Sequence, residues 1–474
     1  SGRRRNWLTP ISNNHDGDDA SPRKRRRTSQ DTRQPRTRTL VLVPVLKRPQ
    51  RSGDAAKTAG ETHTPENRLS EAVGLANAID LDIIDSAIVP MSEPRPSTLL
   101  GSGKVDELGG RVRDLDIGLV IVDHALTPVQ QRNLEKAWNT KVLDRTGLIL
   151  EIFGARARTR EGVLQVELAH LSYQKGRLVR AWTHLERQRG GGGFLGGPGE
   201  AQIELDRRML QDRIDAIKRD LKDVVRTRDL HRKGRRKVPY PIVAVVGYTN
   251  AGKSTLFNKI TGAGVVAMDQ VFATLDPTMR EVKLPSARRI ILSDTVGFIS
   301  DLPTSLVAAF RATLEEVVEA DLILHVRDIA HEETEAQARD VEKVLGELGI
   351  DTLPVDGHIQ EVWNKIDLLT GDRRAELQHE AQRDERPPVL VSAVTGEGIV
   401  PLLDAIDSRL SVADEILDVI IPGSLGALLN WLHETCDVLA REARKDGSIE
   451  LRLRIPSEKK DRVLGQLRKA GLKV

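Results

Sequence analysis

A glycine-rich stretch that follows an apolar run could bind the phosphates of a nucleotide. Residues 242–246 are apolar, and the segment GYTNAGKST follows them. The spacing G-x-x-x-x-G-K-S is typical of a strand, a tight turn and a helix start whose backbone N–H groups meet phosphates. Lys253 would reach the β- and γ-phosphates, and the Ser254 hydroxyl would ligate Mg²⁺. The predicted phosphate loop consists of Gly247, Tyr248, Thr249, Asn250, Ala251, Gly252, Lys253, Ser254 and Thr255.

A second motif, NKID, indicates which base is bound. A carboxylate can accept two hydrogen bonds, from N1–H and from the exocyclic amine of guanine, and adenine offers no such pair. The sequence therefore predicts GTP rather than ATP. The segment Ser392-Ala393-Val394, which follows another apolar run, could close over the base. The predicted base-site residues are Asn364, Lys365, Ile366, Asp367, Ser392, Ala393 and Val394.

Two segments between these motifs could complete a magnesium site. RRIILSDTVGF predicts a strand whose end carries Asp294, suited to the Mg²⁺ shell, and Gly297, whose N–H could meet the γ-phosphate. In the loop FATLDPT, the Thr274 hydroxyl is the expected second metal ligand beside Ser254, with Thr278 as the alternative. The residues assigned to the nucleotide from these segments are Phe272, Ala273, Thr274, Leu275, Asp276, Asp294, Thr295, Val296 and Gly297.

The sequence does not identify a catalytic residue. Phe298 stands where Ras-like enzymes have the glutamine that orients the attacking water, and an aromatic hydrocarbon ring cannot do so. We therefore expect slow intrinsic hydrolysis that a partner or a cation stimulates. Asn250, four residues before Ser254, matches the pattern of potassium-stimulated GTPases related to Era. It could ligate K⁺ or only cap the loop, and the sequence leaves both roles open.

Composition limits the class of protein. The chain has 474 residues, which suggests about three domains, and 72 basic against 69 acidic side chains. Residues 1–38 are basic and lack apolar periodicity, so we expect a disordered tail. The tail either contacts RNA phosphates or is only a solvated, charged segment. No apolar stretch is long enough to span a membrane, and Cys436 is the single cysteine. We expect a cytoplasmic protein, monomeric and without a membrane span.

Strand and helix patterns alternate over residues 39–155 and predict an N-terminal α/β domain. Within it, Gly101, Ser102, Gly103 and Lys104 resemble a shortened phosphate loop. The spacing differs from that of a Walker motif. A turn before a helix is the simpler explanation, and ATP binding at this place is the alternative.

Residues 156–234 predict a long helical hairpin. Leu164, Leu171, Leu178 and Leu185 recur every seven residues, and a second apolar register begins at Ile203. The glycine-rich segment 190–199 would form the tip. Arginines flank it, as expected for an arm that enters folded RNA. The RNA-contact candidates are Arg156, Arg158, Arg160, Arg187, Arg189, Gly190, Gly191, Gly192, Gly193, Phe194, Arg207 and Arg208.

The remaining chain divides into two further units. Residues 240–412 carry the nucleotide motifs and predict a P-loop GTPase domain with a doubly wound, mostly parallel sheet. Residues 413–474 predict a small α/β domain of β-α-β-α-β pattern, with helices near 424–442 and 457–470. The expected fold class is therefore multidomain α/β, with a helical arm ahead of the GTPase domain.

Together, GYTNAGKST, FATLDPT, DTVGF, NKID, LDRTGLILEIFGARARTREGVLQVELAHL and GGGGFLGGPGEAQIELDRR resemble the HflX family of GTPases over residues 39–412. The resemblance implies a ribosome-associated GTPase whose arm approaches the catalytic region of the large subunit. It also implies splitting of stalled or idle ribosomes under stress. Ala201 and Leu205 depart from the family pattern, which has threonine at both positions, and so lack hydroxyls that could cap the second helix or contact RNA.

Three functions follow as hypotheses. The first is a GTP-switched, Mg²⁺-dependent ribosome-splitting factor whose chief partner is the rRNA of the large subunit. The second is an Obg-like GTPase that acts in assembly of the large subunit. The third is an ATP-dependent RNA remodeller that uses residues 101–104, although the sequence lacks helicase motifs.

Overall fold

The structure is a computed structural model. It describes residues 36–47, 63–188, 198–235, 240–262, 272, 278–286, 288–301, 314, 316–350, 358–383, 386–411, 415–444, 446–455 and 460–472. Nearly all of the predicted basic tail lies outside these ranges, as do residues 190–197 of the predicted arm tip and residues 273–277 of the loop that contains Thr274.

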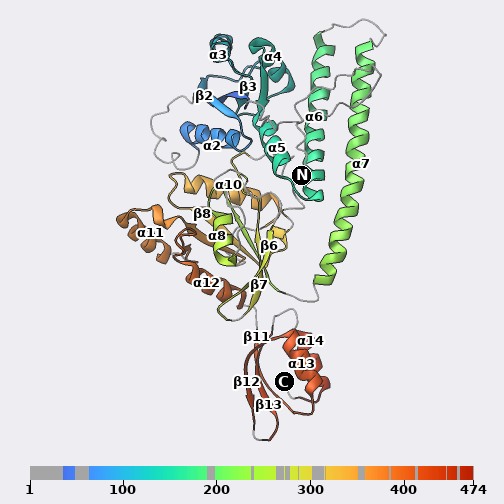
Figure 1. Ribbon diagram of the computed structural model, residues 1–474, viewed down its shortest axis with the longest axis vertical. Coiled ribbons are helices and arrows are strands. Elements are labelled where there is room, and N and C mark those ends of the chain that lie inside the picture. Colours follow the sequence, from blue (N-terminus) through green and yellow to red (C-terminus); the bar gives the residue numbers. More distant parts are fainter. Residues whose placement is uncertain are drawn as a thin grey trace, which may run out of the picture. The chain divides into compact units, whose positions relative to one another are not determined.

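The N-terminal domain is a four-stranded parallel sheet in the order β2-β1-β3-β4, with helices on both faces (Figure 1). Helices α2 and α5 cover one face and α3 and α4 the other. This confirms the predicted alternation of strands and helices. The elements are β1 (Arg38–Leu46), α2 (Pro65–Asn77), β2 (Asp82–Met91), α3 (Ser102–Asp114), β3 (Leu119–Val122), α4 (Pro128–Trp138), β4 (Lys141–Asp144) and α5 (Arg145–Arg156).

Side-chain caps fix where these helices begin. Thr127 and Gln130 form a reciprocal capping box at the start of α4. Asp144 caps α5 by accepting a hydrogen bond from the Gly147 N–H at 2.8 Å. Residue Gly101 precedes α3 directly, so the segment 101–104 is a turn and a helix start, and Lys104 pairs with Glu107.

Two long helices, α6 (Arg160–Gln188) and α7 (Pro198–Arg235), run side by side and form the predicted hairpin (Figure 1). Helix α7 begins at Pro198, so the last two residues of the predicted 190–199 tip belong to the helix. Proline is favoured in the first helical turn, where the missing N–H costs no hydrogen bond.

The GTPase domain contains a six-stranded sheet in the order β10-β9-β8-β5-β7-β6, in which β6 alone of these strands is antiparallel to its neighbour. Helices α8 and α12 pack on one face and α10 on the other. The elements are β5 (Ile242–Gly247), α8 (Lys253–Thr261), β6 (Thr278–Lys283), β7 (Arg289–Asp294), β8 (Leu322–Asp328), α10 (Thr334–Glu347), β9 (Ile359–Asn364), η1 (Ile366–Leu368), α11 (Gly371–Arg383), β10 (Val389–Leu390) and α12 (Ile399–Ser411).

The C-terminal domain corrects one predicted element. The helix expected near 424–442 ends at Thr435, and Asp437–Ala443 forms a strand that pairs antiparallel with its neighbour β13. Pairing with β13 outweighs the helix preference of the Ala, Glu and Arg side chains in that segment. The three-stranded sheet has the order β11-β13-β12. Its elements are β11 (Glu415–Ile421), α13 (Gly426–Thr435), β12 (Asp437–Ala443), β13 (Ile449–Ile455) and α14 (Lys460–Lys469).

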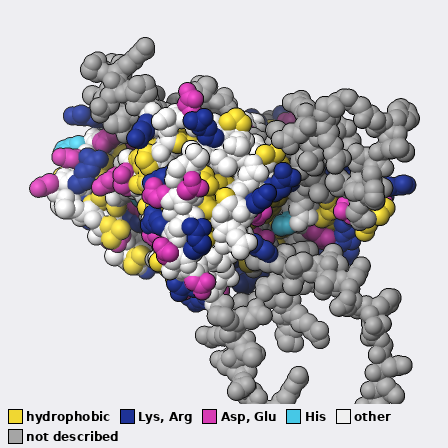
Figure 2. All heavy atoms as spheres, turned by 90° about the horizontal axis from the view of Figure 1, so that it is seen from above, with side chains coloured by type: hydrophobic (Ala, Val, Ile, Leu, Met, Phe, Trp, Pro, Cys, Tyr) yellow, Lys and Arg dark blue, Asp and Glu magenta, His cyan; other side chains and the backbone are white. Residues whose placement is uncertain are grey.

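The described surface mixes both signs of charge. On the face shown in Figure 2, Lys and Arg side chains alternate with Asp and Glu. Within the described ranges, no helix combines the length and apolar character needed to cross a membrane. The limits between domains, predicted near residues 155, 239 and 412, remain predictions that limited proteolysis would test.

Candidate nucleotide site

The loop between β5 and α8 requires glycine at both of its ends. Gly247 has φ 152° and Gly252 has φ 92°. A Cβ added to Gly247 would stand 2.2 Å from the carbonyl oxygen of Val326, and one added to Gly252 would stand 2.2 Å from Asn364 Nδ2. Because neither position accommodates a side chain, the backbone of this loop is free to approach a phosphate closely.

Lys253 is buried at the first position of α8. Its Nζ donates to the carbonyl oxygen of Tyr248 at 2.6 Å. Burial lowers the pKa of Lys253 to about 8, Asp294 opposes this shift, and Lys365 adds to it. The ammonium is therefore held inside the loop, at the place where the sequence predicts contact with the β- and γ-phosphates.

The side chains of Ser254 and Asp294, both predicted at the magnesium site, contact each other. The Ser254 hydroxyl donates to Asp294 Oδ2 at 2.8 Å, and Asp294 ends β7 next to β5. Hydroxyl and carboxylate oxygens are ligands that Mg²⁺ prefers, so these two residues fit that ion. Bound Mg²⁺ would neutralise charge on the β- and γ-phosphates. The third predicted participant, Thr274, lies outside the described residues.

The DTVGF segment lies directly against the phosphate loop. The Phe298 N–H donates to the Gly247 carbonyl at 3.1 Å, and the Thr249 N–H donates to the Phe298 carbonyl at 2.7 Å. The Phe298 side chain is only 1% exposed. A Cβ on Gly297 would stand 2.9 Å from Lys253 Nζ, which explains the glycine there. Phe298 therefore packs as part of the core instead of facing a water molecule.

The residues of the predicted base site contact the phosphate loop through Asn364. Asn364 is buried, donates to the Ala251 carbonyl at 2.8 Å and accepts from the Ala393 N–H at 3.0 Å. It thus joins the NKID motif to the phosphate loop and to the segment containing Ser392, Ala393 and Val394. Lys365 adopts a left-handed conformation, with φ 67°, and pairs with Asp328 at 2.7 Å. The Asp367 side chain remains exposed, as a base-reading carboxylate requires.

A buried polar network that the sequence analysis missed links this site to the N-terminal domain. The Tyr248 hydroxyl donates to the Glu71 carboxylate and accepts from the Ser300 N–H at 2.8 Å. Arg145 donates to the Ser300 carbonyl at 2.7 Å and pairs with Glu71 and with Asp123. We define these residues, Glu71, Asp123, Arg145, Tyr248 and Ser300, as the interdomain network.

Opposite charges are paired within the interdomain network. Burial opposes the charge of Arg145, but Glu71 and Asp123 outweigh it and raise the pKa of its guanidinium. Burial and the Glu71 carboxylate raise the pKa of Tyr248 well above its usual value, so the hydroxyl keeps its proton. No local sequence pattern signals this network, because Glu71 and Tyr248 are 177 residues apart.

The RNA-contact candidates are only partly described. Arg158, Arg160, Arg207 and Arg208 are exposed, and Arg156 is partly buried, with its guanidinium near the Ala78 carbonyl. Arg187 lies within α6, but its side chain lies outside the description, as do Arg189, Gly190, Gly191, Gly192, Gly193 and Phe194.

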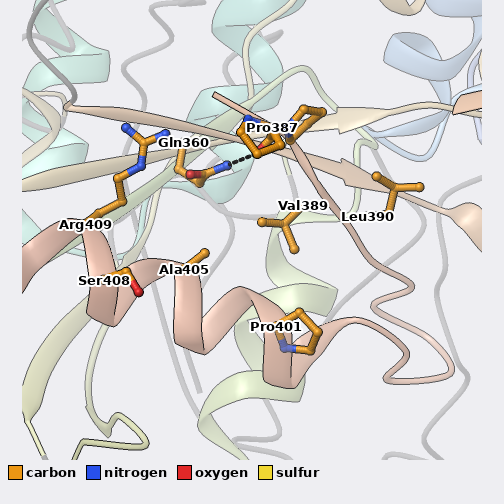
Figure 3. Close-up of a pocket in the computed structure, with 9 residues that line it drawn as sticks. Gln360, Pro387, Val389, Leu390, Pro401, Ala405, Ser408 and Arg409 are labelled. Carbon is orange, nitrogen blue, oxygen red and sulfur yellow. Dashed lines mark hydrogen bonds between the residues drawn. The ribbon is translucent and has the colours of Figure 1, made fainter. Parts of the chain in front are cut away.

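A cavity of about 500 Å³ lies between the edge strand β10 and α12 (Figure 3). None of the residues that line it belongs to the predicted nucleotide site. The lining residues are Gln360, Pro387, Pro388, Val389, Leu390, Pro401, Ala405, Ser408 and Arg409.

Comparisons with known families agree with this geometry. Residues 66–154 match the family described as GTP-binding GTPase N-terminal, and residues 156–235 match GTP-binding GTPase Middle Region. Residues 242–365 match 50S ribosome-binding GTPase, and residues 376–473 match the HflX C-terminal domain. The fold, the glycine-bounded loop and these matches together define a P-loop GTPase.

The relatives show which GTPase family this is. The chain is 52% identical over 371 residues to GTPase HflX of Magnetococcus marinus, covering 78% of this chain and 84% of the relative. It is 44% identical over 393 residues to GTPase HflX of Escherichia coli, covering 82% and 89%. The chain belongs to the HflX family of GTPases and is a GTP hydrolase, as the motifs predict.

Solved structures include a GTP-binding protein from the archaeon Sulfolobus solfataricus in complex with GDP. It is 22% identical, with a TM-score of 0.40, and the match covers 78% of this chain and 98% of that one.

Proposed function

We propose that this GTPase binds the large ribosomal subunit through its helical arm and, in the GTP-bound state, splits stalled or idle ribosomes into subunits. The match of residues 242–365 to a family described as 50S ribosome-binding supports the ribosome as the partner. Large-subunit rRNA is the proposed contact. The splitting step rests on the family resemblance and on the route described next.

The observation that carries the proposal is a continuous set of contacts from the phosphate loop to the arm. The interdomain network holds Tyr248 and Ser300 against Arg145. The residue before Arg145, Asp144, accepts hydrogen bonds from Tyr173 and from Arg177 of α6, both at 2.5 Å. Loops that rearrange around a γ-phosphate could thereby alter how the arm is held. Such a route supports coupling between the nucleotide state and the position of the arm, and a functional measurement tests that coupling.

We also propose the residues that bind GTP and Mg²⁺. The phosphate loop, with Lys253 at its centre, would hold the phosphates. Ser254 and Asp294, joined by Thr274, would hold Mg²⁺, and Asp367 would read guanine beside Asn364 and Lys365. K⁺ is the further cofactor proposed at Asn250.

Sucrose-gradient sedimentation tests the splitting function. Intact ribosomes are incubated with the protein and GTP, GDP or a nonhydrolysable GTP analogue. We expect subunits with GTP and with the analogue, and intact ribosomes with GDP. The variant Ser254→Ala should lose the effect, whereas Ser408→Ala on α12 serves as a matched control. Ribosomes that persist equally with all three nucleotides would overturn the splitting function.

The same gradients separate the alternatives. An assembly GTPase of the Obg type would leave intact ribosomes unchanged and bind immature large subunits. An ATP-dependent RNA remodeller would respond to ATP. At the segment proposed for ATP, Lys104 is already paired with both carboxylate oxygens of Glu107, each at 2.8 Å, which favours the helix-start interpretation.

A further inference from the structure

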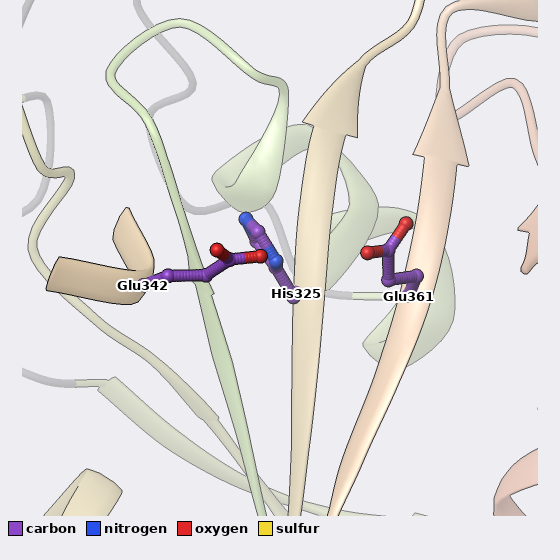
Figure 4. Close-up of side chains that lie close together, drawn as sticks. All are labelled: His325, Glu342 and Glu361. Atoms are coloured by element: carbon purple, nitrogen blue, oxygen red, sulfur yellow. The ribbon is translucent and has the colours of Figure 1, made fainter. Parts of the chain in front are cut away.

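A second cluster of metal-ligating side chains lies in the GTPase domain, apart from the predicted magnesium ligands. His325 of β8, Glu342 of α10 and Glu361 of β9 each offer one ligand atom, and these atoms lie within 4.8 Å of one another. Figure 4 shows the three side chains converging from two neighbouring strands and from the helix that covers them. None of the three belongs to the nucleotide motifs.

The strand pattern explains the convergence. His325 pairs in register with Glu361, so the two side chains share one face of the sheet. Helix α10 packs on that face through Val341, the residue before Glu342. Two strands and one helix thus supply one ligand each, and these elements hold the three side chains in fixed positions.

His325 is 2% exposed. No hydrogen bond joins its ring to any of the residues that the structure describes. An unprotonated imidazole nitrogen can donate its lone pair to a metal ion, and one ring nitrogen of His325 lies within 4.8 Å of a carboxylate oxygen of each glutamate.

Glu361 is oriented as metal-ligating carboxylates usually are. Its Oε2 accepts from Arg327 Nη1 at 3.0 Å and from Trp363 Nε1 at 2.9 Å, which leaves Oε1 for another partner. Hydrogen bonds of this kind fix the ligand and tune its basicity. They explain why the second oxygen can face the cluster.

The charges in the cluster also favour a cation. Glu342 and Glu361 bring carboxylate oxygens within 4.8 Å of each other. Arg327 pairs with Glu361 at 3.0 Å and offsets part of this charge. A divalent ion between the carboxylates would remove the remaining repulsion.

We propose that His325, Glu342 and Glu361 bind a divalent transition-metal ion, with Zn²⁺ as the best-fitting ion. One imidazole nitrogen and two carboxylate oxygens form a donor set typical of Zn²⁺, with water completing the coordination. Mg²⁺ and Ca²⁺ prefer ligand sets made only of oxygen. The ion would tie α10 to β8 and β9, so its binding should stabilise the folded GTPase domain.

Zn²⁺ titration of the full-length, tag-free, metal-stripped protein by calorimetry tests the site, and thermal unfolding supplies a second readout. We expect one equivalent of Zn²⁺ and a rise in Tm. Glu342→Gln and His325→Asn should each weaken binding at least about tenfold, and Trp363→Phe should weaken it by about tenfold through loss of one hydrogen bond to Glu361. These variants act on three different elements, so misfolding of one leaves the others informative.

Two matched controls locate the ion. Glu332→Gln removes an exposed carboxylate near the start of α10, and His63→Gln removes another imidazole flanked by two carboxylates. Both should bind Zn²⁺ as the parent protein does. The proposal is overturned if the parent binds no Zn²⁺, if Glu342→Gln binds it unchanged, or if His63→Gln abolishes the binding.

Discussion

Asp367 illustrates how one exposed side chain can decide nucleotide choice. It follows Asn364, which is fully engaged with the backbone of two loops, whereas the Asp367 carboxylate faces solvent. These contacts are consistent with the roles proposed for the two residues of NKID. Asn364 supports the site, and Asp367 remains available to the base.

We predict that Asp367→Asn changes the base preference. The amide oxygen still accepts from N1–H, but the new N–H donor faces the exocyclic amine of guanine and repels it, whereas xanthine has a carbonyl acceptor at that position. Loss of one charge-assisted hydrogen bond costs about 1.5–3 kcal/mol, roughly a tenfold to hundredfold loss of GDP affinity. Fluorescent-nucleotide titration with GDP and with xanthosine diphosphate measures both changes. Asp372→Asn, an exposed aspartate five residues after NKID, is the control, and equal losses in the two variants would contradict the assignment.

Asn250 also belongs to the residue scale. Its backbone is left-handed, with φ 60°, and its side chain is exposed at the phosphate loop. We predict faster GTP hydrolysis in K⁺ than in Na⁺ at equal ionic strength, because a cation beside the phosphates could supply charge that Phe298 cannot. Phosphate release in the two salts measures this. Equal hydrolysis rates in K⁺ and Na⁺ would contradict K⁺ binding at Asn250 and leave capping of the phosphate loop as its role.

At the scale of elements, Asp144 anchors the arm. Its carboxylate caps α5 and accepts from Tyr173 and Arg177 of α6, and the Arg177 guanidinium also lies 4.2 Å from the centre of the Tyr173 ring. One side chain therefore joins the sheet, α5 and the hairpin.

We predict that Asp144→Asn lowers the free energy of unfolding by about 3 kcal/mol, because the partly buried Arg177 charge loses its counter-charge. The amide retains the helix cap, which limits the loss. Urea denaturation followed by circular dichroism measures the change, with Asp212→Asn on the exposed side of α7 as control. A change below about 0.5 kcal/mol, ordinary for surface substitutions, would show that the arm does not depend on this anchor.

At the scale of the whole molecule, His63 adds a second link between the N-terminal and GTPase domains. Its two ring nitrogens contact Asp340 at 2.8 Å and Glu333 at 2.6 Å, and Glu333 also accepts from the Thr64 N–H that precedes α2. The hydrogen bond to Asp340 and then that to Glu333 raise the pKa of His63 to about 9, against the opposing effect of burial.

We predict that this link weakens as the pH rises. A raised folded-state pKa stabilises the protein fully below the unfolded value of about 6.5, and the contribution is lost as the pH rises through about 9. The free energy of unfolding should therefore fall more between pH 6 and 9.5 in the parent than in His63→Gln. Urea denaturation at both pH values of the two proteins provides the comparison. Parallel pH profiles would show that His63 does not titrate at the interface.

The sequence by itself determined the nucleotide chemistry, because phosphate binding uses the backbone of one contiguous loop and its motifs keep fixed spacing. It also determined the hairpin, since a seven-residue apolar repeat is a local signal. It did not determine β12, whose residues also suit a helix and whose state depends on pairing with β13.

Only the tertiary structure decided which distant side chains meet. Glu71, Arg145 and Ser300 reach the phosphate loop because two sheets and their helices pack together, and no spacing in the sequence encodes that contact. The same holds for His325, Glu342 and Glu361, whose convergence follows from strand register and from the helix placed over it. Local patterns thus specified the chemistry of the GTP site, and packing specified what surrounds it.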